Sequence, residues 1–414
     1  ASPRGLNVAV RAASLLDPHR AGMVAAGLAL LLLVPCRLAS AVRQGAHRAD
    51  FPPFASFVQR FGRTYEQGSA EWEERRGVYE RRAAEALRQN SRQDRRWTAG
   101  LNEFWDWTDR EQLALRGWRR SARPAGAAGR GAPALPAAGA SLLGGLPEPH
   151  GKNWTQLRSV RVVRNQGGCG SCWAIASATT LEAHSEIHAR AARTFSPQQL
   201  VSCVPNPRHC GGGGGCDGAT VELAMEWVMK NGCAEEYQVP YASVDGRCSA
   251  GAAAPQAPTA LSSGAGGSAA LAFGMTGWER LPENRYRPLL RALAERGPVA
   301  VSAAARSWVT YGGGVFDGCN KDAIIDHAVV LVGYGEDPHT KDAFFLLQNS
   351  WGHGWGEGGR IRLLRHTTDT AWCGIDDQPE LGTGCKGGPE KVTVCGMCGV
   401  LYDSVIPHFG AIPA

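Results

Sequence analysis

The pattern of apolar and polar residues predicts helices in one part of the chain and strands in the next. Apolar residues recur at helical spacing over 173–187 and 221–228, and a Ser-Pro pair at 196–197 supplies an N-cap followed by proline. A short helical run, 289–294, is stopped by Gly-Pro. The strand-like runs that follow are 299–301, 327–332, 344–348 and 360–364. Helices followed by an antiparallel sheet predict an α+β fold of two lobes with a cleft between them.

The N-terminal third has a different character. Residues 51–120 are charged, and a rough helical stripe runs along them through Glu71, Arg75, Tyr79, Ala83, Ala86 and Asn90. Residues 121–145 are mostly Ala, Gly, Pro and Arg, which predicts a flexible linker open to proteolysis. Residues 1–41 contain a short apolar core and end in Ala-Ser-Ala, as signal peptides do, and Met23 is a candidate for the true start. The apolar core is too short to predict a stable membrane span.

Composition narrows the class of protein. The 414 residues allow two or three compact units. The excess of 44 Lys and Arg over 38 Asp and Glu is small and lies largely in the Arg-rich first third, so nucleic acid is not an expected partner. Of 13 cysteines, all but one lie at or after Cys169, which indicates an oxidising compartment and a disulfide framework.

Cys172 is a candidate nucleophile, because other residues of the chain can activate it. A cysteine attacks as the thiolate, so it needs an imidazole to take its proton and donors to hold the oxyanion. His327 opens an apolar strand, where a polar residue has no packing reason to be. The Asn349 amide can orient that imidazole, and Trp351 can shield their hydrogen bond from water. Gln166 can donate its amide to the oxyanion beside the Cys172 N–H, and a helix starting near Cys172 favours the thiolate.

The motifs around these residues, in this order, resemble the papain-like cysteine proteases of the cathepsin L and related type. The resemblance assigns the oxyanion, nucleophile, base and orienting roles to Gln166, Cys172, His327 and Asn349. It implies a papain-like peptidase domain over residues 146–414, with a helical lobe and an antiparallel, β-barrel-like lobe. The implied activity is that of a cysteine endopeptidase that hydrolyses polypeptides and requires no metal or organic cofactor.

Residues 51–120 resemble the inhibitory propeptides of the same family. The stripe residues Glu71, Arg75, Tyr79 and Asn90 fit the family's helical signature, whereas Arg82 and Ala86 stand where it usually has Asn and Ile. Residues 100–106 match the family's Gly-x-Asn-x-Phe-x-Asp segment in full. The resemblance implies a zymogen with a helical propeptide in its cleft and an activating cleavage in residues 121–145, near the start of the mature enzyme at 144–147. Acid is expected to weaken the inhibition as carboxylates such as Asp106 take up protons.

The resemblance also implies disulfides. It pairs Cys169 with Cys216 and Cys203 with Cys248. For Cys319 the candidates are Cys373 and Cys398, and Cys398 fits the family's terminal strand better. Cys210 and Cys233 are additional and are expected to pair with each other. Three further cysteines then leave one odd thiol besides Cys172: Cys373, Cys385 and Cys395. Residues 376–393 are an insertion relative to the shorter members of the family.

Substrate contacts are implied at Gly218, Ala219, Thr220, Val221, Asp326, Ala328, Trp351 and Asp403. Ala219 replaces the second glycine of the family's Cys-x-Gly-Gly, which narrows the entrance to the pocket. The pocket for the residue two before the scissile bond is expected to involve Thr220, Val221 and Ala328. Asp403 at its base would let it accept a basic side chain besides Leu, Val or Phe.

Other interpretations are less well supported. Cys169 and Cys172 have the spacing of a thioredoxin-like redox pair, but no βαβ pattern surrounds them. Cys395 and Cys398 have the spacing of half a zinc site, but no second Cys-x-x-Cys stands in a suitable place, which favours disulfides. At the level of function, the alternatives are a papain-like exopeptidase, which needs something to block one end of the cleft, and a catalytically silent binding or storage homologue. The expected partners are polypeptide substrates, the chain's own propeptide and cystatin-type inhibitors, in the secretory pathway, a lysosome- or vacuole-like compartment, or outside the cell.

Overall fold

The structure is a computed structural model that describes residues 51–116, 151–248 and 273–410. The expected signal peptide (1–41), the linker (121–145) and the activation site lie outside the described residues. Among the residues that are described, no helix is both long and apolar enough to cross a membrane.

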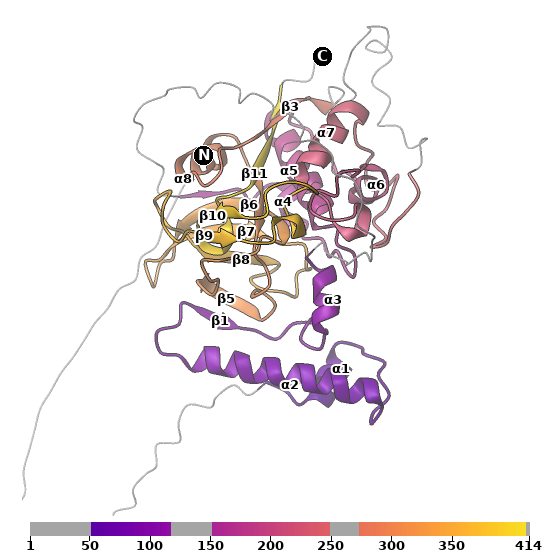
Figure 1. Ribbon diagram of the computed structural model, residues 1–414, viewed down its shortest axis with the longest axis vertical. Coiled ribbons are helices and arrows are strands. Elements are labelled where there is room, and N and C mark those ends of the chain that lie inside the picture. Colours follow the sequence, from indigo (N-terminus) through magenta and orange to yellow (C-terminus); the bar gives the residue numbers. More distant parts are fainter. Residues whose placement is uncertain (1–50, 117–150, 249–272, 411–414) are drawn as a thin grey trace, which may run out of the picture. The chain divides into compact units, whose positions relative to one another are not determined.

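Helices dominate the first part of the described chain (Figure 1). The α-helices are α1 (Phe54–Arg60), α2 (Ala70–Ser91), α3 (Asp109–Ala114), α4 (Arg158–Arg161), α5 (Cys172–His188), α6 (Pro197–Cys203), α7 (Val221–Asn231) and α8 (Tyr286–Glu295). The 3-10 turns are η1 (Gly215–Asp217), η3 (Pro379–Leu381) and η4 (Met397–Gly399). Ser196 caps α6 through the Gln199 N–H, with Pro197 at the first position, as the sequence predicts. Thr108 and Glu111 form a capping box at α3.

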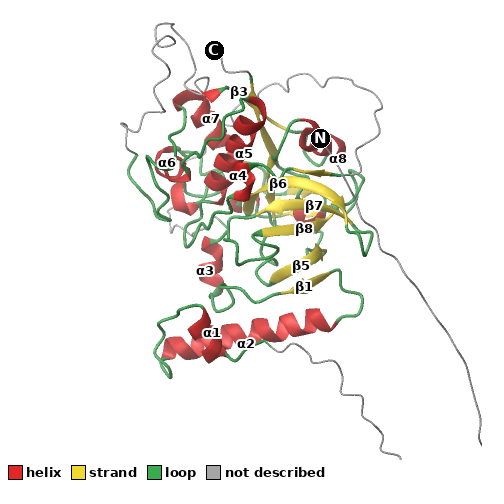
Figure 2. Cartoon of the chain, turned by 180° about the vertical axis from the view of Figure 1, so that it is seen from behind, coloured by secondary structure: helices red, strands yellow, loops and turns green. Residues whose placement is uncertain are grey.

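A large sheet follows (Figure 2). Its strands are β1 (Trp97–Ala99), β2 (Lys152–Asn153), β3 (Met275–Arg280), β4 (Val299–Ala303), β5 (Tyr311–Phe316), β6 (His327–Glu336), β7 (Ala343–Gln348), β8 (Arg360–Leu364) and β11 (Ser404–Phe409). Its order is β1-β5-β8-β7-β6-β4-β11-β3, with β2 on β6. Its pairs are antiparallel except β5 with β8. All four predicted strand runs are confirmed, as β4, β6, β7 and β8.

The sheet is covered on both faces, and this explains the unbroken apolar run of β6. Val329 and Leu331 pack into one core with α8, whereas Ala328, Val330 and Val332 pack into a second core with α5, α6 and α7. Alternate residues of a strand point to opposite faces, so a strand between two cores is apolar throughout. The predicted α+β fold, with a helical lobe and a sheet lobe, is confirmed.

Residues 51–116 fold around α2 and join the edge of this sheet. Arg82 of α2 donates to the carbonyls of Phe104 and Trp105 at 2.7 and 2.8 Å. Asn90 exchanges two hydrogen bonds with the backbone of Ala99, at 2.7 and 3.0 Å. Strand β1 then pairs with β5, so that the helical stripe of the sequence anchors a segment that lies against the peptidase sheet. Arg82 stands where the family usually has Asn, and its guanidinium binds the backbone of the 100–106 segment.

The structure contains these disulfides within the described residues: Cys169–Cys216, Cys203–Cys248, Cys319–Cys398, Cys210–Cys385 and Cys373–Cys395. The first three are the pairs that the resemblance implies. The expected Cys210–Cys233 pair is wrong. Cys233 is buried under the helical lobe as a free thiol, and Cys210 is bonded to the insertion instead.

Candidate active site

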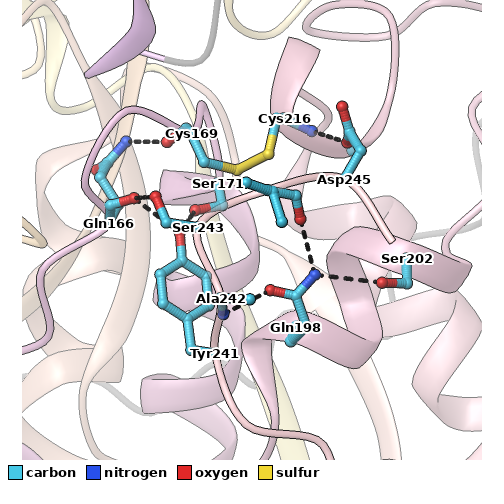
Figure 3. The surroundings of a disulfide bond; sticks show 12 residues. Gln166, Cys169, Ser171, Gln198, Ser202, Cys216, Tyr241, Ala242, Ser243 and Asp245 are labelled. Carbon is cyan, nitrogen blue, oxygen red and sulfur yellow. Dashed lines mark hydrogen bonds between the residues drawn. A yellow bond between two sulfur atoms is a disulfide. The ribbon is translucent and has the colours of Figure 1, made fainter. Parts of the chain in front are cut away.

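Cys172 is the first residue of α5, where the positive end of the helix dipole favours a thiolate. The loop before it is tied down on both sides (Figure 3). Cys169 is bonded to Cys216, and the Gly170 N–H donates to the Cys216 carbonyl at 3.0 Å. The Tyr241 hydroxyl donates to the Gln166 carbonyl at 2.9 Å and contacts the Ser171 hydroxyl. Because Cys169 is occupied by Cys216, the redox-pair interpretation does not apply.

His327 lies across the pocket from α5, as the first residue of β6. Its Nε2 contacts Asn349 Oδ1 at 2.7 Å, and the same oxygen accepts from the Ser350 N–H at 2.8 Å, so Nε2 carries the proton. This leaves Nδ1 as the acceptor of a neutral ring, and it has no hydrogen-bond partner among the described residues. The Trp351 ring lies 5.1 Å from the imidazole, where it excludes water from the His–Asn bond.

Gln166 is fully buried and is held by the loop that carries Asn349. The Gln166 N–H donates to the Ser350 carbonyl at 2.8 Å, and Ser350 Oγ donates to Gln166 Oε1 at 2.6 Å. These contacts turn the amide nitrogen, Nε2, toward the Cys169 carbonyl at 2.9 Å and the Leu115 carbonyl at 3.0 Å. The donor expected to serve an oxyanion therefore already binds a main-chain carbonyl from residues 51–116.

Leu115 and Arg116 occupy the site. The Leu115 carbonyl also accepts from Trp351 Nε1 at 3.3 Å. Arg116 follows with a buried side chain that lines the same pocket as Cys172 and His327, and its Nη1 lies 3.4 Å from the Asp326 carboxylate. About 10 Å³ of space remains in this pocket, room for about one water molecule.

Burial keeps both reactive groups neutral in this form of the chain. It raises the pKa of the Cys172 thiol to about 11. Hydrogen bonds from backbone amides lower this pKa, but by less than burial raises it. Burial also lowers the pKa of His327 to about 4, although the bond to Asn349 opposes this shift. At neutral pH the thiol is thus protonated and the imidazole uncharged, which is the unreactive state of such a pair.

The expected substrate residues separate into two groups. Five line the pocket with Cys172 and His327: Ala219, Thr220, Val221, Asp326 and Ala328. Three do not: Gly218, Trp351 and Asp403. Ser302 of β4 takes the place expected for Asp403.

Asp403, expected at the base of this pocket, is bound by two side chains and is not among the residues that line it. Ser302 Oγ donates to Asp403 at 2.6 Å, and Arg280 Nε of β3 donates to the same carboxylate at 2.9 Å. Arg280 therefore neutralises the charge of the Asp403 carboxylate, and a basic substrate side chain would have to compete with Arg280 for it. The sequence could not reveal this, because Arg280 lies 123 residues before Asp403.

Sequence reasoning also missed three parts of the site. Leu115 and Arg116 lie within the expected propeptide but carry no motif of their own. The available signal was their position shortly after the 100–106 segment, on the part of the propeptide that continues toward the site. Tyr241, from a stretch with no recognisable pattern, binds the loop before Cys172. Leu381 and Gly382, from the insertion, line the pocket as well.

Comparison with known proteins places the chain. Residues 148–383 match the family model described as papain family cysteine protease. The oryzain beta chain of Oryza sativa subsp. japonica is 32% identical over 309 residues, which are 73% of this chain and 59% of oryzain beta. Cysteine endopeptidase Rep1 of the same rice is 32% identical over 310 residues, 73% of this chain and 76% of Rep1. The chain belongs to the papain family of cysteine proteases.

Solved structures share the fold. The recombinant stem bromelain precursor has a TM-score of 0.62 at 24% identity, over 86% of this chain and 97% of that chain. Digestive procathepsin L 3 of Tenebrio molitor has a TM-score of 0.62 at 22% identity, over 86% of this chain and 98% of that chain. Identities this low support the fold alone. The chain spans less than two thirds of several curated relatives, with 59% of oryzain beta and 54% of rice cysteine protease 1.

Proposed function

We propose that the chain is a cysteine endopeptidase made as an inactive zymogen, with Cys172 as nucleophile, His327 as base and Asn349 as the residue that orients the imidazole. The observation that carries this proposal is the placement of a thiol at a helix N-terminus in one pocket with an imidazole whose Nε2 is bound by Asn349. A catalytically silent homologue would have no need of this set.

The steps follow from these positions. His327 Nδ1 takes the proton of Cys172, and the thiolate attacks the peptide carbonyl. Gln166 Nε2 and the Cys172 N–H stabilise the oxyanion. His327 then gives its proton to the leaving amine, and a thioester joins the substrate to Cys172. A water molecule, deprotonated by His327, hydrolyses this acyl-enzyme and restores the thiol.

Asn349→Ala tests the orienting role. The variant keeps the nucleophile and the base but releases Nε2, and a misplaced catalytic group typically costs on the order of 10²-fold in rate. We expect kcat on a fluorogenic peptide to fall by about this factor in the processed chain, with little change in KM. Asn231→Ala, which alters an exposed amide at the end of α7 instead, is the control. An unchanged kcat for Asn349→Ala would contradict the assigned role.

We propose further that residues 51–116 are the inhibitor of the zymogen. Three observations support this: the Leu115 carbonyl binds Gln166 and Trp351, Arg116 fills the pocket beside Asp326, and the Asn102 side chain donates to the Val309 carbonyl at 2.7 Å. Residues 121–145 remain the proposed place of the activating cleavage, and 146–414 the proposed peptidase domain. The disulfides favour the secretory pathway as the compartment.

In the closed form, residues 51–116 cover the site. Acid should release these residues through protonation of His327. The pKa of the buried imidazole is about 4, against about 6.5 for an exposed histidine, so the open form binds the extra proton. The stability of the closed form falls as the pH drops from about 6.5 to about 4, by up to roughly 3 kcal/mol. Burial raises the pKa of Asp326, so protonation of that carboxyl favours the closed form and opposes part of the effect. Within residues 51–116, Arg63 and Tyr65 bind the Asp106 carboxylate.

Hydrogen exchange tests this expectation. In the inactive Cys172→Ser chain, exchange of the β1–β5 amides, corrected for the intrinsic effect of pH, should accelerate between pH 6.5 and 4.5. Adding His327→Phe should remove most of the acceleration in that window. The same acceleration in both chains would show that another group controls opening.

A further inference from the structure

The insertion after β8 crosses from the sheet lobe to the helical lobe. Strands β9 (Gly374–Asp376) and β10 (Val392–Val394) pair with each other, and the strap (residues 377–391) connects them. At its far end Cys385 is bonded to Cys210. The Gly211 N–H donates to the Gly384 carbonyl at 2.8 Å, and the Lys386 N–H donates to the Arg208 carbonyl at 2.9 Å.

The near end of the strap is fixed as firmly. Asp376 is fully buried, and its carboxylate accepts from the Ile325 N–H at 3.0 Å and the Gln378 N–H at 2.9 Å. The Asp322 carboxylate accepts from the Ile375 N–H at 2.8 Å. The strap is thus bound to the helical lobe by a disulfide and backbone hydrogen bonds, and the strand before it is held in the sheet lobe by bonds between carboxylates and backbone N–H groups.

Between these anchors the strap is wedged into the cleft. A Cβ added to Gly382 would overlap the Ile325 carbonyl and lie 3.0 Å from Asp326 Cα. A Cβ added to Gly211, on the other side, would lie 2.5 Å from the Gly382 carbonyl and 3.0 Å from the Ala219 carbonyl. Gly382 therefore packs closely against Ile325 and Asp326, the two residues before His327, and its carbonyl packs against Gly211 on the other side.

The wedge lies on the amino side of the bond to be cut. Leu381 and Gly382 line the pocket that also contains Cys172, and Thr220, Val221 and Ala328 complete its wall. Under the roles given above, Cys172 and Gln166 mark the scissile carbonyl, and these three residues receive the side chain two positions before it. The strap closes the far side of that pocket.

We propose that the strap limits the substrate to two residues on the amino side of the cut bond. This inference rests on the proposed chemistry of Cys172 and His327, and it restricts the proposed endopeptidase to releasing dipeptides from the amino end of a chain while the strap is in place. With Cys210–Cys385 intact, the processed enzyme takes peptides with a short amino side, and it cuts within long chains only when the strap leaves the cleft.

The test uses processed enzyme and two fluorogenic peptides with the same residues around the cut bond. One has two residues and a free amine on the amino side, and the other has six residues there. Cys210→Ser/Cys385→Ser frees the tip of the strap, and a second variant replaces residues 377–391 by a short Gly-Ser turn. Cys203→Ser/Cys248→Ser, which removes a disulfide of the helical lobe only, is the matched control.

For the wild type and the control variant we expect kcat/KM to be at least about tenfold higher on the short peptide, equivalent to about 1.4 kcal/mol. Either strap variant should raise kcat/KM on the long peptide to within about twofold of the short one. Equal cleavage of both peptides by the wild type, or a preference that survives in both strap variants, would overturn the inference. If wild type cuts neither peptide and Cys172 takes no active-site label, the proposed function itself fails.

Discussion

Replacing Cys172 by serine is expected to lower kcat/KM of the processed chain by at least about 10⁴-fold. A serine hydroxyl does not ionise under conditions where a cysteine thiol does, and a site arranged around the larger sulfur does not bring the hydroxyl to the substrate carbonyl. So that processing does not depend on the activity of the chain itself, both chains are to be cut between residues 121 and 145 by an added protease. Initial rates on the two-residue peptide then give the comparison.

Cys233 provides the matched control. It is the other free cysteine of the described residues, and burial raises the pKa of its thiol to about 12. The thiolate is the reactive form of cysteine, and the raised pKa keeps the Cys233 thiol protonated. Cys233→Ser should therefore leave kcat/KM within about twofold of the wild type. Residual activity of Cys172→Ser near the wild-type level would mean that another residue attacks the substrate.

Glu182→Ala should give the largest loss of stability. Glu182 of α5 is buried, and its carboxylate accepts from Arg164 at 2.7 and 3.1 Å and from the Phe195 N–H at 2.8 Å. Removing one partner of a buried ion pair leaves the other charge uncompensated and costs about 3–5 kcal/mol. We expect about 3 kcal/mol here, because Glu236 still contacts Arg164. The urea midpoint of the Cys172→Ser chain measures the change.

This pair also positions the site, since Arg164 lies two residues before Gln166 and Glu182 lies on the helix that begins at Cys172. Arg164→Met/Glu182→Leu should recover much of the lost stability, as apolar replacements of buried pairs often do. Glu226→Ala, which breaks an exposed pair with Lys230 on α7, should change it by less than about 1 kcal/mol. A Glu182→Ala effect no larger than that of Glu226→Ala would contradict the account.

The sequence predicted the parts of the site that local motifs define. Cys172 at a helix start and His327 at a strand start lie where the patterns of their own neighbours put them. Strands β4, β6 and β7 were recognisable as short apolar runs and β8 as an alternation of Arg with apolar residues, with glycines in the segments that separate them. The edge strands β1 and β3 were missed, since each is short or half-buried and has no such run.

Contacts between distant segments could not be predicted in the same way. Cys385 lies 175 residues from Cys210, and many pairings of the extra cysteines are compatible with their spacing alone. Helix α5 was expected to be amphipathic, but it is buried at every residue from Cys172 to Ser185 because the sheet, α6 and α7 surround it. Its polar residues are satisfied inside the core, as Glu182 is by Arg164.

Labelling with an epoxysuccinyl inhibitor tests the central claim most directly, that Cys172 is a nucleophile covered by residues 51–116. The measurement is the rate at which the intact chain and the processed chain take up the label, with the modified residue located by mass spectrometry. We predict slow labelling of the intact chain at neutral pH, fast labelling after processing, modification at Cys172, and none in Cys172→Ser. Equal rates before and after processing, or a label on another residue, would contradict the claim.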